Sequence, residues 1–187
     1  WATVVVREDA QADHLSEELD FSYSHDTLTG LLNRSLFETD LRTLQSSEYD
    51  SMVCTYIDVV GLHEINNHLG HRSGDAMLCF IANAARKFFA SSRIYRIGGD
   101  EFVVFLPIPN PAWARQKAEA LVAALHYTFQ DGTSSCPISA SIGVALAPES
   151  GTDFETLYKK ADAALYQTKR TGKDGYCLLY TSPSPRD

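Results

Sequence analysis

The stretch Arg96-Ile97-Gly98-Gly99-Asp100-Glu101-Phe102 decides how this chain folds. It joins two runs with the composition of strands, residues 92–95 and 103–106. Two such runs joined by a Gly-Gly pair predict a β-hairpin with a two-residue type I′ turn, in which both central residues take positive φ. The adjacent carboxylates of Asp100 and Glu101 repel each other unless a cation or a group of hydrogen-bond donors lies beside them. The sequence therefore predicts a metal site on a hairpin.

The chain as a whole has the length and composition of one globular domain with flanking segments. Its 187 residues are 44% hydrophobic, which is enough for a proper core. The formal net charge of −8 argues against a nucleic-acid partner, because binding to a nucleic-acid backbone relies on clustered Lys and Arg. A substrate that carries phosphate would therefore need metal ions and a few well-placed cations.

The sequence also limits where the protein works. No apolar run approaches the roughly 18 residues needed to span a bilayer, so we expect no membrane contact by this segment. The four cysteines are far apart and lack the spacing of metal sites or disulfide scaffolds, which favours buried thiols in a reducing compartment. We therefore expect a cytoplasmic location, and leave open whether the parent protein is tethered to a membrane.

Hydrophobic patterning divides the chain into three segments. Residues 1–25 combine the end of a strand with a charged helix, which is typical of a connector from an upstream domain. Residues 26–180 carry the pattern of a folded domain. Residues 181–187 have the composition of a linker or tail, without a hydrophobic anchor.

Helices and strands alternate in the central segment without a regular βα repeat. Hydrophobic periodicity and capping residues predict helices over residues 35–46, 64–69, 74–90, 111–129 and 153–171. Strands are predicted over residues 51–57, 92–95, 103–106, 137–147 and 176–180. Because one strand pair is an antiparallel hairpin, these elements indicate an α+β fold in which helices pack on a sheet.

Three carboxylates lie at the ends of predicted strands. Asp58 ends the first strand of the central segment, and Asp100 and Glu101 begin the strand after the glycine turn. If these strands are neighbours, about 4.8 Å apart, the carboxylates converge on one cation or a cation pair. Mg²⁺ held in this way neutralises phosphate charge and lowers the pKa of an attacking hydroxyl, as phosphoryl or nucleotidyl transfer requires. Solvated strand ends are the alternative interpretation.

Five separate blocks of the sequence resemble, in order and spacing, the GGDEF family of diguanylate cyclases. They are Gly98-Gly99-Asp100-Glu101-Phe102, Asp26-Thr27-Leu28-Thr29-Gly30-Leu31-Leu32-Asn33-Arg34, Asn66 with Gly70-His71, Gly74-Asp75, and Ser141-Ile142-Gly143-Val144-Ala145. The resemblance runs from about residue 26 to residue 180. It implies a fold similar to the palm of nucleotide cyclases and polymerases, with a central, mostly antiparallel five-stranded sheet flanked by helices.

The resemblance also implies an activity. Two domains meet as a homodimer, each holds one GTP, and each 3′-hydroxyl attacks the α-phosphate of the other nucleotide, giving cyclic di-GMP and two pyrophosphates. The implied cofactor is Mg²⁺ or Mn²⁺, two ions per half-site. An upstream sensory domain is the implied partner in the full-length protein.

By this resemblance, four residues have roles at the metal. Asp58 and Asp100 are metal ligands, and the Val59 carbonyl is a further ligand. Glu101 assists at the metal or in deprotonating the 3′-hydroxyl. Taken alone, as above, these acids are also consistent with solvated strand ends.

The resemblance assigns the substrate contacts to a second set of residues. The turn glycines let the backbone approach the phosphates. A carboxylate can accept hydrogen bonds from guanine N1–H and the exocyclic amine, a pattern that adenine does not offer. Without the family pattern, the same residues would be a turn end, a helix N-terminus and a solvated helix end. The substrate-binding set is Gly98, Gly99, Leu62, His63, Asn66, Asp75, Lys169 and Lys173.

The chain departs from the family pattern after Asp58. The family usually has an acid two residues on, then an aromatic residue and a lysine, where this chain has Val60-Gly61-Leu62-His63. Histidine has an unperturbed pKa of about 6.5, so we expect weaker or pH-dependent phosphate binding than with lysine. Lys173 replaces a more common arginine and exchanges a bidentate fork for a point charge. Asn67 replaces a frequent aspartate.

A further departure concerns regulation. Many relatives bind their own product at an Arg-x-x-Asp motif five residues before the glycine pair. The corresponding window here, Phe89-Ala90-Ser91-Ser92, carries neither charge. We therefore expect no product inhibition through that site.

Two functions remain open from the sequence. The first is a diguanylate cyclase, because the metal and guanine positions are filled. The alternative is a catalytically degenerate GGDEF domain that binds GTP and regulates a partner domain, which Val60, His63 and Lys173 favour. A cyclase that uses a single nucleotide is disfavoured by Asn66 and Asp75.

Overall fold

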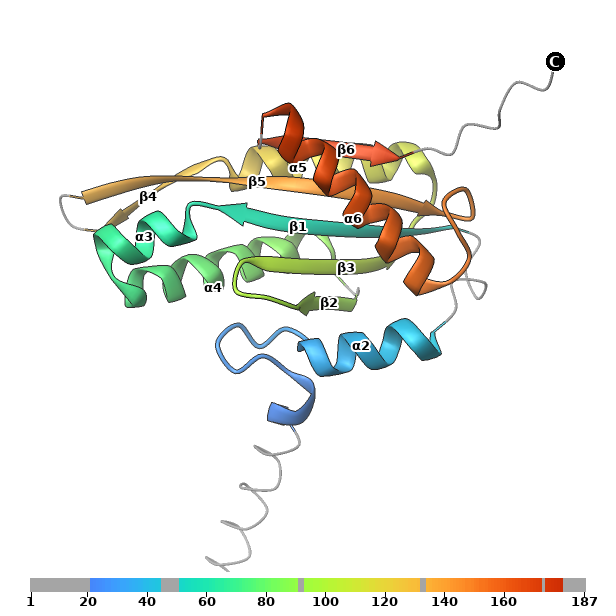
Figure 1. Ribbon diagram of the computed structural model, residues 1–187, viewed down its shortest axis with the longest axis horizontal. Helices are drawn as coiled ribbons and strands as arrows, with labels where there is room; N and C mark the ends of the chain where they lie inside the picture. Colours follow the sequence, from blue (N-terminus) through green and yellow to red (C-terminus); the bar gives the residue numbers. More distant parts are fainter. Residues whose placement is uncertain (1–20, 45–50, 91–92, 132–133, 173, 180–187) are drawn as a thin grey trace, which may run out of the picture.

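The computed structural model in Figure 1 describes residues 21–44, 51–90, 93–131, 134–172 and 174–179. Residues 21–24 are helical, as predicted for the end of the connector helix. The predicted strand at residues 1–6, the rest of the connector helix, Lys173 and the tail at 181–187 lie outside the described residues.

A curled sheet forms the centre of the molecule. Five strands pair antiparallel in the order β2-β3-β1-β5-β4, and β6 adds to β5 in parallel. This arrangement confirms the α+β fold with a mostly antiparallel five-stranded sheet. The strands are β1 (Met52–Val60), β2 (Arg93–Arg96), β3 (Glu101–Pro107), β4 (Tyr127–Asp131), β5 (Ser134–Ala147) and β6 (Gly175–Leu179).

Helices cover both faces of this sheet (Figure 1). The apolar side chains of α4 and α5 pack on one face, and those of α2 and α6 pack on the other. Because both faces are covered, β1 is buried along almost its whole length, which explains its continuous apolar run. The helices are α2 (Arg34–Thr43), α3 (Leu62–Leu69), α4 (His71–Phe88), α5 (Pro111–Leu125) and α6 (Phe154–Thr171).

Capping residues set three of the helix starts. The side chains of Asn33, Asn110 and Asp153 accept hydrogen bonds from the first turns of α2, α5 and α6, respectively. Each satisfies a backbone N–H that has no partner within the helix. Thr168 donates its hydroxyl to the Ile142 carbonyl at 3.0 Å, which ties the last turns of α6 to β5.

The predicted helix over residues 111–129 is too long, and this prediction was wrong at its end. The helix stops at Leu125, and residues 127–131 form strand β4 against the start of β5. Tyr127, Thr128 and Phe129 favour a strand, and pairing with β5 outweighs continuation of the helix. Pro137 is tolerated inside β5 because the pairing with β1 extends only as far as Ser139.

Candidate functional site

The glycine turn between β2 and β3 has a different geometry from the predicted type I′ turn. Neither Gly98 nor Gly99 is among the described glycines with positive φ. The Ile97 amide donates to the Glu101 carbonyl at 3.0 Å, so the hairpin is closed by the three residues between them. The prediction was wrong because a Gly-Gly pair in a sequence does not reveal where the last paired residues of the hairpin lie.

Glu101 explains why residue 98 is a glycine. A Cβ at Gly98 would collide with the Glu101 carboxylate. The other oxygen of that carboxylate accepts a hydrogen bond from the Tyr56 hydroxyl at 2.8 Å, and the Tyr56 ring stacks on Tyr158 with centroids 5.4 Å apart. Burial and the hydrogen bond to Glu101 raise the pKa of Tyr56, so this phenol remains a donor. Glu101 is therefore held between the turn and the sheet.

The predicted metal-binding carboxylates come together on neighbouring strands. Asp58 lies directly opposite Glu101 in the β1–β3 ladder, and the Val59 amide donates to the Asp100 carbonyl at 3.0 Å. Strand β1 does not end at Asp58 as predicted but continues to Val60, because β5 still pairs with it there. Burial first, and the charge of Asp58 second, raise the pKa of Asp100.

A pocket of ≈ 220 Å³ lies over these residues. Lys169 enters it from α6 and donates to Asp58 Oδ2 at 2.5 Å, with side-chain exposures of 37% for Lys169 and 15% for Asp58. The pocket is lined by Asp58, Val59, Val60, Gly61, Leu62, His63, Glu64, Asp100, Ser141 and Lys169. Predicted metal, phosphate and substrate positions thus share one cavity, whereas Glu101 is bound to Tyr56 beside it.

The residues of this pocket fit a hard divalent cation. The Asp58 and Asp100 carboxylates and the Val59 carbonyl form the all-oxygen donor set that Mg²⁺ prefers. The raised pKa of Asp100 reflects negative charge crowded on a partly buried site, which a bound cation would relieve. Among the described residues, no three His, Cys, Asp or Glu side chains converge as a metal cluster.

The predicted guanine-binding residues lie on α3 and α4. Asn66 on α3 rests against Gly74 on α4, where a Cβ would collide with the Asn66 Oδ1 atom. Asp75 is the next residue of α4 and is exposed. Asn66 therefore contacts the residue that precedes Asp75. Neither Asn66 nor Asp75 is among the residues that line the pocket. The sequence predicted both residues but missed the role of Gly74 in bringing the helices together.

Two of the departures from the family pattern contact each other. The His63 ring nitrogen Nε2 and the Asn67 side-chain amide nitrogen are 2.8 Å apart, one helical turn apart on α3. Both side chains are exposed, and His63 lines the pocket. Where the family pattern has a lysine and an aspartate, this chain thus has two side chains joined by a hydrogen bond in place of two charges.

Arg96 connects the block at residues 26–34 to the glycine turn. Its guanidinium binds both carboxylate oxygens of Asp26 at 3.1 Å and donates to the Gly99 carbonyl at 2.9 Å. Asp26 also accepts hydrogen bonds from the amide and hydroxyl of Thr29. Burial would raise the pKa of Asp26, but the bonds from Thr29 and the charge of Arg96 outweigh it, and the pKa is lowered. No sequence motif predicted this role of Arg96.

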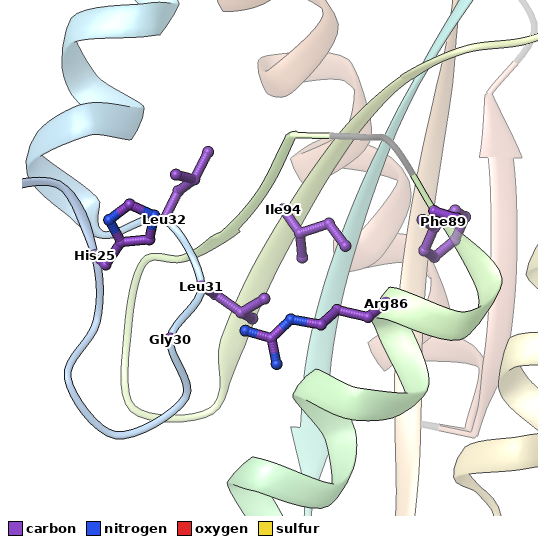
Figure 2. A pocket seen from close by; sticks show the side chains of 8 residues that line it. His25, Gly30, Leu31, Leu32, Arg86, Phe89 and Ile94 are labelled. Atoms are coloured by element: carbon purple, nitrogen blue, oxygen red, sulfur yellow. The ribbon is translucent and has the colours of Figure 1, made fainter. Parts of the chain in front are cut away.

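A second pocket, of ≈ 340 Å³, lies between the segment around Gly30 and the end of α4. Figure 2 shows Arg86 extending from α4 toward Gly30 and Leu31. Arg86 donates to the Thr29 carbonyl at 2.8 Å. Phe89 and Ala90, the first half of the window that lacks the product-binding charges, line this pocket.

Comparison with known proteins identifies the family. Residues 23–175 match the family model described as "Diguanylate cyclase, GGDEF domain". The chain belongs to the GGDEF domain family. A solved structure of the isolated GGDEF domain of TpbB (YfiN) from Pseudomonas aeruginosa has the same fold, with a TM-score of 0.73 and 34% identity over 82% of this chain and 93% of that one.

Curated relatives of this GGDEF domain are longer proteins. It is 37% identical over 162 residues to the "Bifunctional diguanylate cyclase/cyclic di-GMP phosphodiesterase MucR" of Pseudomonas aeruginosa, covering 84% of this chain and 24% of MucR. It is also 37% identical to the "Diguanylate cyclase TpbB" of the same species, covering 80% of this chain and 36% of TpbB. The chain thus spans about a quarter to a third of these relatives. Within the described residues, no helix has the length and apolar character needed to cross a membrane.

Proposed function

We propose that this GGDEF domain is a diguanylate cyclase that condenses two GTP into cyclic di-GMP with release of two pyrophosphates. The observation that carries the proposal is the pocket lined by Asp58, Val59 and Asp100, in which Lys169 is bonded to Asp58. Carboxylates on neighbouring strands with a cation above them suit the binding of a metal–triphosphate complex.

Asp58, Asp100 and the Val59 carbonyl hold Mg²⁺ or Mn²⁺, two ions per half-site, with Glu101 assisting. The bound cation neutralises charge on the triphosphate and lowers the pKa of the attacking 3′-hydroxyl. Glu101 is not among the lining residues of the pocket, because its carboxylate accepts a hydrogen bond from Tyr56. It acts on the 3′-hydroxyl only if it gives up this hydrogen bond. In its observed position it fixes the turn that carries Asp100.

Lys169 binds the triphosphate together with Lys173. In the structure Lys169 neutralises Asp58, at a distance of 2.5 Å. A divalent cation held here would neutralise Asp58 in place of Lys169, and the Lys169 ammonium would then bind the phosphates. His63 and Leu62 border the same pocket and contribute to the nucleotide contacts.

Asn66 and Asp75 recognise guanine. Their placement on adjoining helices lets an amide and a carboxylate face one base edge, and the carboxylate accepts from N1–H and the exocyclic amine. Adenine lacks that donor pair, so the site prefers GTP.

The reaction requires a homodimer, because one domain supplies one nucleotide and half of the bond-forming groups. An upstream sensory domain in the full-length protein controls how two such domains meet. Product inhibition through the window at residues 89–92 is absent, because this window lacks both charged residues.

The test is an assay of the domain, dimerised through its upstream segment, with GTP and Mg²⁺ or Mn²⁺. We expect cyclic di-GMP by chromatography, and loss of product in Asp100→Ala. Asp162→Ala is the matched control, because it removes an exposed carboxylate on α6 that lies outside the pocket. Equal product from wild type and Asp100→Ala would contradict the assigned site.

A second candidate is a catalytically degenerate domain that binds GTP and regulates a partner. The His63–Asn67 hydrogen bond favours it, because it leaves Lys169 as the one lysine or arginine among the described residues that line the pocket. A bifunctional relative whose name includes a phosphodiesterase activity is a precedent for a partner domain. GTP binding without turnover in the same assay would support this candidate.

A further inference from the structure

Ser141 carries a hydroxyl that the rest of the site leaves unexplained. Ser141 is fully buried, with 0% of its surface exposed. Its Oγ atom is buried and has no hydrogen-bond partner among the residues that the structure describes. A buried hydroxyl without a partner opposes folding, because it loses its hydrogen bonds to water. Such a group therefore calls for an explanation in terms of a ligand or of a change at the site.

The sheet places this hydroxyl beside the proposed metal-binding carboxylate. Ser141 on β5 lies directly opposite Asp58 on β1. Directly opposite residues of an antiparallel pair share a face, with Cβ atoms about 4.5–5.5 Å apart. Ala145 and Ala147, which alternate in step with Ser141 along β5, pack in the cluster beneath α6, and Asp58 meets Lys169 of α6. Both side chains therefore face α6, and both line the 220 Å³ pocket.

Asp58 supplies the carboxylate that lies directly opposite Ser141. The Thr168 hydroxyl directs its proton to the carbonyls of Ile142 and Ala164, so it is not a donor to Ser141. Lys169 is a donor and cannot accept a hydrogen bond. Lys169 occupies Asp58 Oδ2, so the carboxylate is held toward α6 while this ion pair lasts.

We propose that Ser141 is a positioning residue for Asp58: its hydroxyl donates a hydrogen bond to the Asp58 carboxylate when Lys169 leaves that carboxylate for the triphosphate. The inference rests on the proposed function, in which Asp58 turns from a lysine partner to a divalent cation. Carboxylates that bind metals are commonly oriented by hydrogen bonds from a neighbouring residue, and loss of such a bond weakens metal binding by about 10- to 100-fold. The same hydroxyl stays unpaired in the unliganded protein, as observed.

The experiment measures metal binding without catalysis. Wild type, Ser141→Ala, Ser141→Thr and the control Ser139→Ala are melted at a fixed concentration of a GTP analogue with an α,β-methylene bridge, over a series of Mn²⁺ concentrations. Ser139 lies on the same face of β5, two residues away and outside the pocket lining, so its variant controls for loss of a hydroxyl from this strand. Urea melts without metal or nucleotide give the stability of each unliganded variant.

We expect Ser141→Ala to need about tenfold more Mn²⁺ for half of the stabilisation, while Ser139→Ala and Ser141→Thr remain within about threefold of wild type. The urea midpoint of unliganded Ser141→Ala should equal or exceed that of wild type, because an unpaired hydroxyl is removed.

Four results would overturn the inference. An unchanged Mn²⁺ requirement in Ser141→Ala, with normal stabilisation of wild type, rejects the role of Ser141 and leaves the proposed function standing. Equal shifts in Ser141→Ala and Ser141→Thr show that the hydroxyl is not responsible. A lower urea midpoint of unliganded Ser141→Ala shows that the hydroxyl is already paired. If wild type shows no Mn²⁺-dependent stabilisation, the proposed function fails, and the role of Ser141 fails with it.

Discussion

At the scale of single residues, Asp100 has an environment that opposes its own charge. Its carboxyl is partly buried near the charges of Asp58 and Glu101, and burial followed by the charge of Asp58 raises its pKa above the ordinary value of 3.8. Lys169 offsets this only in part, because it is bonded to Asp58. Sites that bind cations commonly accept such repulsion, which destabilises the protein when no ligand is present.

Asp100→Asn should therefore stabilise the protein in the presence of a chelator at neutral pH. A carboxyl whose pKa is raised by folding binds protons more tightly in the folded state, so its unfavourable contribution is absent below the unfolded value of 3.8. That contribution grows as pH rises from 3.8 to the raised folded pKa and is complete above it. Urea melts in EDTA should show the free energy of unfolding of Asp100→Asn exceeding that of wild type at pH 7, with the difference vanishing toward pH 3.

Asp162→Asn controls for loss of a carboxylate in general, because Asp162 is exposed on α6 and outside the pocket. It should leave the free energy of unfolding nearly unchanged at both pH values. A lower stability of Asp100→Asn at pH 7 would mean that the Asp100 carboxylate is favourably paired in the unliganded protein, contrary to the charge balance described above.

At the scale of elements, Arg96 joins the segment that precedes α2 to the turn between β2 and β3. Its side chain is 14% exposed, and it binds the Asp26 carboxylate together with the Gly99 carbonyl. Arg96→Gln should lower the free energy of unfolding by about 1.5–3 kcal/mol, the range for hydrogen bonds to charged groups. It should also reduce turnover, because the turn that carries Asp100 loses its tie. Urea melts and initial rates of product formation measure the two effects.

Arg34→Gln is the matched control for Arg96→Gln. Arg34 forms an exposed ion pair with Glu38 on α2, 72% and 49% exposed, and such pairs contribute little to stability. We expect a clearly smaller change in stability and no change in rate. If both variants lose the same stability, the partly buried position of Arg96 has no special value.

Gly74 controls how closely α3 approaches α4. A methyl group at this position collides with the side-chain Oδ1 of Asn66, so Gly74→Ala should displace the amide that we propose binds guanine. We expect affinity for GTP to fall about tenfold while affinity for ATP changes little, as loss of one hydrogen bond of about 1–1.5 kcal/mol predicts. Calorimetry or fluorescence with both nucleotides measures this loss of preference.

A double-mutant cycle with Asn66→Ala separates this effect from a general change in α4. In the Asn66→Ala background, Gly74→Ala should cost no further affinity, because the atom it displaces is absent. Alanine is also the better helix former, by about 1 kcal/mol, so a stability gain is expected there. Additive losses of affinity in the double variant would show that Gly74 acts independently of Asn66.

The sequence predicted elements better than contacts. Hydrophobic periodicity and the cap Asn33 located most of the helices within a few residues, since these signals are local. The end of the helix at Leu125 was missed because pairing of β4 with β5 is a tertiary effect. The type I′ turn was wrong because the register of a hairpin decides which residues form its loop.

The residues of the candidate site were also predicted better than the contacts between them. Family motifs predicted the two aspartates and the lysine that share the pocket. The aspartates share it because β1 and β3 are neighbours, and Lys169 reaches it from α6. The contacts of Tyr56 with Glu101 and of Arg96 with Asp26 were not predicted, because each joins residues that are far apart in the sequence. Periodicity shows which side a residue faces, but the identity of its partner depends on strand order and register.

At the scale of the whole molecule, the two pockets are separate. The pocket of Asp58 and that of Arg86 have no lining residue in common. The segment at residues 26–34 touches both regions, since Arg86 binds the Thr29 carbonyl and Arg96 binds Asp26. A ligand in the second pocket would therefore contact the same loop that holds the glycine turn.

Product should not exploit that connection in this chain. Phe89 occupies the first position of the window, is 2% exposed, and packs in the apolar core beneath α4, so it offers no charge to a phosphate. Initial rates at saturating GTP should therefore stay constant as cyclic di-GMP is added, apart from competition that more GTP relieves. Inhibition that persists at saturating GTP would contradict this expectation. Arg86→Ala would then locate the effect, because Arg86 is the lysine or arginine among the described residues that line this pocket, and loss of inhibition in that variant would place the product there.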